Sequence, residues 1–275
     1  MLKRVSPLPL IIAHRGASGL VPENTALAVA AAIVLGADMV EVDARLTRDG
    51  QLVIFHDPSL GRTARFSHHP SRVTRHGSIR IADMTLYEIG ELDAGSWYDR
   101  DFAGLRIPTV MEILTLCAGR IALNLEVKVD REATLAIRKQ IVAQLDRALR
   151  TQPRMWTSNS VLISSTDHPL LQLARNIMPK ATLGLLAQAD ADGTAAWLSN
   201  TLRTADRLEA FSLHLPWPLV TPALMATLRS RRKKLRLFAY TVNSASRMHR
   251  LMTDGVDGLF TDHPERLLAR LRSTV

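Results

Sequence analysis

The sequence predicts an α/β protein whose fold is a (β/α)8 TIM barrel with a small insertion between its second strand and second helix. Apolar segments of strand length alternate along the chain with longer segments of helical periodicity. Such alternation implies parallel strands, and its repetition without a polar linker favours closure into a barrel. The length of 275 residues suits one barrel, so we expect a single domain over residues 1–275. The alternative is an open doubly wound sheet, but its usual glycine-rich dinucleotide loop is absent after the first strand.

The first βα unit is expected near the N-terminus. Apolar runs at residues 8–13 and 38–42 read as the first two strands, and an alanine-rich helix between them ends before Gly36. Either Asn24 or Thr25 is placed to cap the start of this helix. We read residues 1–7 as a short lead-in to the first strand.

The second unit is interrupted. Asp49-Gly50 predicts a turn into an added strand at residues 51–55, which would bring His56 back to the mouth of the barrel. Residues 60–106 lose the alternation and are expected to form the insertion over the top of the barrel, before the helix at residues 110–118. Its own core is expected to contain Trp97, Tyr98 and Phe102.

The remaining units follow in order. Strands are expected at residues 121–127, 160–164, 182–186, 210–213, 235–241 and 258–261. Helices are expected at residues 132–149, 170–177, 194–202, 221–231, 245–253 and 264–271.

Carboxylates at the strand ends predict a metal site. Glu41 and Asp43 are separated by one residue, so in a strand both side chains leave the same face, and they repel each other unless a cation lies between them. Glu126 and Lys128 have the same spacing at the end of the third strand. Solvated carboxylates and a Glu–Lys surface pair are the alternatives, but three converging carboxylates favour one divalent cation, Mg²⁺ or Ca²⁺.

Two histidines and two cations complete the candidate site. His14 and Arg15 follow the first strand, and parallel strands end at one edge of the sheet, so both should lie beside the carboxylates. His14 and His56 suit general acid and base roles, because imidazole titrates near neutral pH. Arg15 and Lys128 suit the binding of phosphate oxygens. The sequence does not say which histidine is the acid.

Neighbouring polar residues are expected to support this site. Glu23 and Asn24 are placed to hold Arg15 or substrate hydroxyls, with helix capping as the alternative for Asn24. Arg62 is expected to be a structural partner of Asp57 and lies outside the predicted catalytic set.

Six segments, in order, resemble the glycerophosphodiester phosphodiesterase family of the bacterial, cytoplasmic type. They are HRGASGLVPENT, EVDARLTRDGQLVIFHD, LDAGSWYDRDFAGLRIPTVMEIL, LNLEVK, YTVN and GVDGLFTDHP. The resemblance implies an inserted subdomain, metal-binding acidic residues at Glu41, Asp43 and Glu126, and catalytic roles for His14 and His56. The chain departs from the family at Tyr240, where tryptophan is common, and in the basic stretch at residues 64–80.

The resemblance also implies an activity, the metal-dependent hydrolysis of glycerophosphodiesters to sn-glycerol 3-phosphate and an alcohol. A lysophospholipase D-like enzyme and an inert binding protein on the same fold are the alternatives. The attacking group is either a substrate hydroxyl, through a cyclic phosphate, or water.

Composition limits the partners. The net charge of +9 suits an anionic small-molecule substrate, whereas the basic run at residues 229–234 reads as a solvated helix end, so no nucleic-acid partner is expected. No apolar run approaches the ~20 residues of a membrane span. The single cysteine, Cys117, is expected in the core and fits a cytoplasmic location. The sequence does not indicate an oligomeric state.

Overall fold

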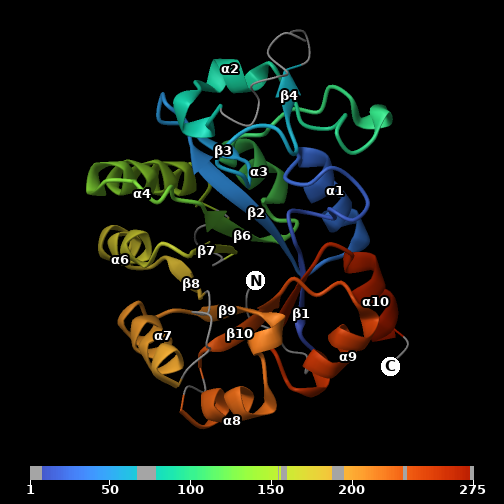
Figure 1. Cartoon of the computed structure of the whole chain (residues 1–275), viewed down its shortest axis with the longest axis vertical. Helices are drawn as coiled ribbons and strands as arrows, with labels where there is room; N and C mark the ends of the chain where they lie inside the picture. The colour runs from blue at the N-terminus through green and yellow to red at the C-terminus, as the bar shows by residue number, and fades with distance from the viewer. Residues whose placement is uncertain are drawn as a thin grey trace.

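The computed structural model describes residues 8–66, 79–153, 155, 160–187, 195–231 and 234–272. In these residues, eight parallel strands close into a barrel, in the order β1-β11-β10-β9-β8-β7-β6-β2 with β2 pairing back to β1 (Figure 1). The strands are β1 (Leu10–Ala13), β2 (Met39–Leu46), β6 (Ala122–Val127), β7 (Val161–Ser165), β8 (Thr182–Leu186), β9 (Ser212–Pro216), β10 (Arg236–Tyr240) and β11 (Gly258–Thr261).

Each barrel strand is followed by a helix on the outside of the barrel, as Figure 1 shows. These helices are α1 (Ala26–Leu35), α3 (Val110–Cys117), α4 (Leu135–Arg150), α6 (His168–Ile177), α7 (Ala195–Arg207), α8 (Pro222–Arg231), α9 (Ala245–Thr253) and α10 (Pro264–Arg272). The predicted (β/α)8 barrel is therefore confirmed, and the open-sheet alternative is wrong. None of the helices in the described residues has the length and hydropathy that a membrane crossing requires.

Capping residues set the ends of the helices. Thr25, and not Asn24, caps α1, because its hydroxyl accepts the N–H of Ala28. Gly36 ends this helix at a φ of 84°, a conformation that glycine adopts without steric cost. Thr134 caps α4, so this helix begins three positions later than residue 132, where the sequence predicted its start.

Outside the barrel, aliphatic side chains fill the space between the strands and the helices, and Cys117 is fully buried among them.

Inside the barrel, the side chains form two layers. An apolar layer forms from Leu10, Ile12, Met39, Ala122, Leu162, Phe238 and Phe260. Further along the same strands, the inward positions become polar, as at Glu41, Asn124 and Ser164, all of which are buried. The polar layer lies toward the carboxyl ends of the strands, the edge at which barrel enzymes carry their active sites.

The insertion follows β2, as expected, and lies at the top of Figure 1. Strand β3 (Leu52–Ile54) pairs antiparallel with β2, and the short strands β4 (Arg65–Phe66) and β5 (Leu92–Asp93) pair with each other. Two 3₁₀ helices, η2 (Ile81–Asp83) and η3 (Arg100–Phe102), and the short helix α2 (Leu86–Gly90) complete it. Its buried side chains are Val53, Phe55, Leu60, Ala64, Ile81, Met84, Ile89, Leu92, Ala94 and Ile107.

The prediction that Trp97, Tyr98 and Phe102 form this core is wrong. The ring of Tyr98 packs edge to face with the other two, but all three rings lie outside the buried cluster, and Tyr98 is 37% exposed. The segment between them carries Asp99, Arg100 and Asp101, which stay in solvent and keep this segment at the surface.

Candidate active site

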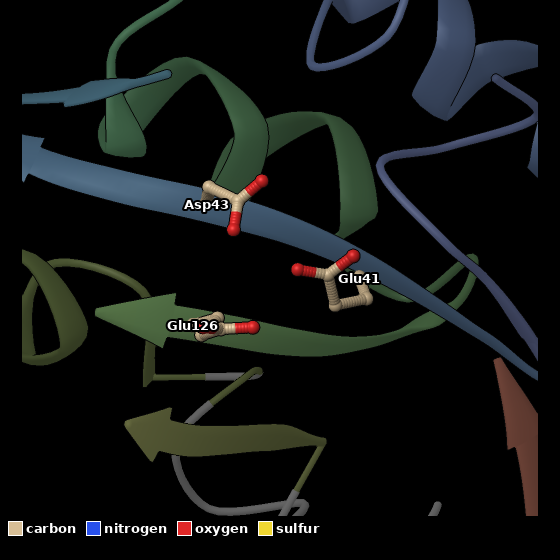
Figure 2. Close-up of side chains that lie close together, drawn as sticks. All are labelled: Glu41, Asp43 and Glu126. Carbon is tan, nitrogen blue, oxygen red and sulfur yellow. The ribbon is translucent and has the colours of Figure 1, made fainter. Parts of the chain in front are cut away.

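Three carboxylates meet inside the barrel where β2 and β6 approach their carboxyl ends. Glu41 and Asp43 are each 1% exposed and Glu126 is 9% exposed, and one oxygen of each lies within 4.8 Å of one oxygen of the others. Figure 2 shows them pointing toward one another. The register pairs Asp43 with Glu126, so the alternation of side chains along both strands turns all three inward.

Burial and neighbouring charges give the carboxyls opposite pKa shifts. Burial, followed by repulsion from Asp43, raises the pKa of Glu41 to about 8. Burial alone would also raise the pKa of Asp43, but the charges of Lys128 and Arg15 outweigh it and lower this pKa. The ammonium Nζ of Lys128 lies 3.1 Å from Asp43 Oδ1 and also contacts Glu126. Asp43 is therefore the charged member of the pair in the absence of an ion.

These residues fit a hard divalent cation. Glu41 Oε2 accepts the backbone N–H of Arg15 at 2.8 Å, whereas Oε1 is buried and has no hydrogen-bond partner among the described residues. Three carboxylates together supply the oxygen ligands that Mg²⁺ and Ca²⁺ prefer, and their mutual repulsion falls when a cation binds. The donor set does not distinguish between these two ions.

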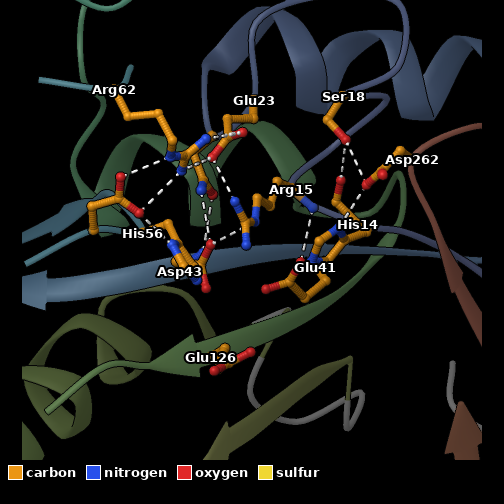
Figure 3. A network of polar contacts seen from close by, with 12 residues as sticks. His14, Arg15, Ser18, Glu23, Glu41, Asp43, His56, Arg62, Glu126 and Asp262 are labelled. Atoms are coloured by element: carbon orange, nitrogen blue, oxygen red, sulfur yellow. Dashed lines mark hydrogen bonds and ion pairs between the residues drawn. The ribbon is translucent and has the colours of Figure 1, made fainter. Parts of the chain in front are cut away.

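His14 is held by a carboxylate from the far end of the chain. Its Nδ1 lies 2.6 Å from Asp262 Oδ1, and Ser18 Oγ also donates to Asp262 (Figure 3). Asp262 accepts a further hydrogen bond from Asn243 Nδ2. Burial would lower the pKa of the imidazole, but the hydrogen bond that it donates to Asp262 and the charge of Glu41 raise this pKa overall. With Nδ1 bound to Asp262, Nε2 is the nitrogen left for chemistry.

His56 has the same arrangement on the other side of the carboxylates in Figure 3. Its Nδ1 lies 2.6 Å from Asp57 Oδ1, and Arg62 Nε donates to Asp57 Oδ2 at 2.7 Å. The hydrogen bond from His56 and those from Arg62 lower the pKa of Asp57. The expected pairing of Arg62 with Asp57 is confirmed, and Arg62 also binds Glu23.

Arg15 and Asp43 are fixed by the residues that precede α1. Arg15 Nη1 donates to Glu23 at 2.7 Å, and its Nε lies 3.4 Å from Asp43 Oδ2. Asn24 Nδ2 donates to Asp43 Oδ2 at 2.8 Å, while Asn24 Oδ1 accepts the backbone N–H of Asp43 at 3.0 Å. Glu23 therefore holds Arg15, as one of the sequence readings proposed. Asn24 instead holds Asp43.

A cavity of about 380 Å³ connects these groups. Its lining contains six of the seven predicted site residues, and Asp43 lies behind them against Lys128 and Asn24. The cavity is lined by His14, Arg15, Glu41, His56, Glu126, Lys128, Thr166, Leu186, His214, Tyr240, Thr241 and Phe260. This volume lies within the ~300–1,000 Å³ of small-molecule sites.

Some residues of the site were missed by the sequence reasoning. Asp262 and Asn243 each follow a predicted strand closely, and that position was a signal that could have placed them at the active edge of the barrel. His214 gave the same signal, because it directly follows the strand predicted at residues 210–213, and the structure places it within β9. It lies stacked on Phe238 with 5.2 Å between ring centroids, and burial lowers its pKa to about 3, so it is neutral.

The fold and this cavity define a (β/α)8-barrel enzyme with an acidic centre flanked by two carboxylate-bound histidines. The model of the glycerophosphoryl diester phosphodiesterase family matches residues 14–266, and the chain belongs to this family.

Relatives and solved structures agree with this assignment. The chain is 35% identical over 264 residues to a glycerophosphodiester phosphodiesterase of Caldanaerobacter subterraneus subsp. tengcongensis, covering 96% of this chain and 98% of the relative. It is 28% identical to a glycerophosphodiester phosphodiesterase of Bacillus subtilis, covering 93% and 84%. A phosphodiesterase of Oleispira antarctica, solved with its product sn-glycerol-3-phosphate, superposes with a TM-score of 0.81 at 28% identity, covering 96% and 97%.

Proposed function

We propose that this enzyme hydrolyses glycerophosphodiesters to sn-glycerol 3-phosphate and an alcohol, with one divalent cation and with His14 and His56 as acid and base. The observation that carries the proposal is the cavity in which two carboxylate-bound histidines flank three buried carboxylates. The substrate class is proposed from the family to which the chain belongs and from the similar Oleispira antarctica phosphodiesterase, whose structure holds sn-glycerol-3-phosphate.

Glu41, Asp43 and Glu126 would hold the cation, since Glu41 Oε1 is buried without a partner among the described residues. Mg²⁺ or Ca²⁺ bound there would offset the charge of a phosphodiester and polarise its phosphorus–oxygen bonds. Arg15 and Lys128, both at the cavity wall, would bind phosphate oxygens. Their partners Glu23, Asp43 and Glu126 hold the two cationic groups in place before the substrate arrives.

The histidines move the protons. Asp262 and Asp57 bind Nδ1 of His14 and His56, which orients each ring, and at His14 the carboxylate also raises the pKa of the imidazole. We favour a route in which one histidine deprotonates the glycerol hydroxyl next to the phosphoester. That oxygen attacks phosphorus, the alcohol leaves with a proton from the other histidine, and a cyclic phosphate forms. Water then opens the ring to give glycerol 3-phosphate, with the two histidines in exchanged roles.

The test is turnover of glycerophosphocholine by the chelator-treated protein, with release of glycerol 3-phosphate as the readout. We expect activity to be lost in chelator and restored by Mg²⁺ or Ca²⁺. Full activity after rigorous removal of metal would contradict the metal site. A phosphorus NMR search for the cyclic phosphate, together with an analogue that lacks the vicinal hydroxyl, separates the two routes. Normal turnover of that analogue would exclude attack by the substrate hydroxyl.

The structure favours neither alternative function. Phe66 and Trp97, whose exposure would have supported access for a lysolipid, are both half-buried. An inert binding protein would not need two histidines each held by a carboxylate. We further propose that the chain acts as a single domain in the cytoplasm. The single cysteine, Cys117, is a buried free thiol, and a chain without an internal disulfide is compatible with this location.

A further inference from the structure

One oxygen of the Glu41 carboxylate is buried without a donor. Oε2 accepts the backbone N–H of Arg15 at 2.8 Å, but Oε1 has no hydrogen-bond partner in the described part of the chain. A carboxylate oxygen has two acceptor sites, so a cation bound to Oε1 would still leave one site for a protein donor. Carboxylates that bind metal ions are commonly held by such a second hydrogen bond.

Asn124 carries the complementary atom. Its side chain is 0% exposed, and its Oδ1 accepts the hydroxyl hydrogen of Ser164, with 2.8 Å between the oxygens. This hydrogen bond fixes the amide so that Nδ2 faces away from Ser164. Nδ2 is also buried, and it has no partner among the described residues. A buried amide without an acceptor carries a desolvation cost, so an acceptor within reach is expected.

The register places the donor beside the acceptor. Glu41 on β2 and Asn124 on β6 are direct partners in the parallel ladder, and the next inward pair is Asp43 with Glu126. The residues on either side of Asn124, Leu123 and Leu125, face the outer core. Asn124 therefore lies inside the barrel next to Glu41, one inward position before Glu126.

We propose that Asn124 is a positioning residue for Glu41: when Glu41 binds the cation, Nδ2 of Asn124 donates to Oε1 and holds the carboxylate in that orientation, while Ser164 fixes the amide. The inference rests on the proposed function, because it takes Glu41 as a metal ligand. It assigns Asn124 an effect on the affinity for the ion, with no part in proton transfer.

The experiment is calorimetric titration of Mg²⁺ and Ca²⁺ into the chelator-treated full chain. Asn124→Leu keeps a similar volume and removes the donor. We expect it to raise the dissociation constant about 10–100-fold, the range found for residues that support metal ligands. Ser164→Ala frees the amide and should weaken binding by a smaller factor, roughly threefold or more. Both variants should recover most of the wild-type kcat at saturating ion, since the chemistry is untouched.

Ser212→Ala is the matched control. Ser212 is equally buried inside the barrel, but it binds His214 Nε2 at 2.8 Å on the opposite side from β2, so its loss should leave the dissociation constant unchanged. Metal-free melting temperatures of all variants separate a loss of affinity from a loss of folding. Wild-type affinity in Asn124→Leu would overturn the inference alone, while a wild-type chain that binds neither ion would overturn the metal site with it. If Asn124→Leu does not fold, unchanged affinity in Ser164→Ala overturns the inference.

Discussion

Both proposed catalytic histidines have a carboxylate at Nδ1, and the two carboxylates come from different parts of the chain. Asp57 is adjacent to His56 in sequence, whereas Asp262 reaches His14 from the end of β11. The first pairing is local and the second depends on closure of the barrel. The contact between His14 and Asp262 therefore forms only when the barrel is closed.

Asp262→Asn tests this pairing. The change removes the negative charge that raises the pKa of His14 and leaves the weaker acceptor of an amide oxygen, so this pKa should fall. We expect kcat to drop about 100-fold and the limb of the pH profile due to His14 to move to lower pH. Asp101→Asn, on the 3₁₀ helix η3 where the side chain is exposed, is the control and should change neither quantity. An unchanged pH profile in Asp262→Asn would remove Asp262 from the mechanism.

Glu41 and Asp43 should respond oppositely to loss of charge in the metal-free protein. The pKa of Glu41 is raised to about 8 by burial and by Asp43, so its contribution to stability is complete below the unfolded pKa, near 4.5, and is lost as pH rises through 8. Glu41→Gln should therefore stabilise the metal-free chain at pH 8, by about 2–4 kcal/mol.

The pKa of Asp43 is lowered by Lys128 and Arg15, although burial opposes this, so its contribution is present above the unfolded pKa and is lost on acidification. Asp43→Asn should destabilise the metal-free chain at pH 8, and both variants should lose ion binding. Denaturant unfolding in chelator at pH 6 and pH 8 measures both effects. Equal destabilisation by the two substitutions would contradict these assignments.

At the scale of elements, the insertion is held by an aliphatic core that includes residues of β3 and β5. Val53 and Leu92 lie in this core, and β3 leads directly into His56. The insertion thus positions His56 at one end of the proposed active site.

Leu92→Ala should cost about 2–5 kcal/mol of unfolding free energy, because Leu92 is 2% exposed and its loss leaves a cavity. Tyr87→Ala, on α2 of the same insertion, is 80% exposed and should cost less than about 0.5 kcal/mol. Chemical denaturation with a spectroscopic probe compares the two. A negligible cost for Leu92→Ala would mean that the insertion contributes no cooperative stability.

At the scale of the whole molecule, the proposed ion would link β2 and β6 near the point where the insertion leaves the barrel. Ligands that bind only the folded state stabilise it, by about 2.7 kcal/mol at a concentration of 100 Kd. We therefore expect the melting temperature of the wild-type chain to rise as Mg²⁺ or Ca²⁺ is added. Glu41→Gln should abolish this rise, and a rise that persists in Glu41→Gln would place the ion elsewhere.

Much of the fold was predictable because strand and helix periodicity are local properties. The barrel, the added strand before His56 and the convergence of Glu41, Asp43 and Glu126 all follow from alternation and from the shared edge of parallel strands. Contacts between distant segments were not predictable in this way. The hydrogen bonds from His14 to Asp262 and from Ser164 to Asn124 depend on register and on side-chain orientation, which composition and spacing do not encode.

The core of the insertion could not be predicted from the sequence either. Its aromatic residues were expected to form the core because large rings bury much apolar surface. Mostly aliphatic residues spread over Val53 to Ile107 fill it together with Phe55, and charged neighbours keep Tyr98 at the surface.

Cys117 offers a reporter that needs no substrate. It is the single cysteine, it is 0% exposed on α3, and burial raises the pKa of its thiol to about 12. A disulfide reagent added to the native enzyme should therefore react only when α3 detaches from the barrel. The rate of thiol labelling then measures how often the helical layer opens, and ion binding that slows this labelling would show that the acidic centre also restrains the outer wall of the barrel.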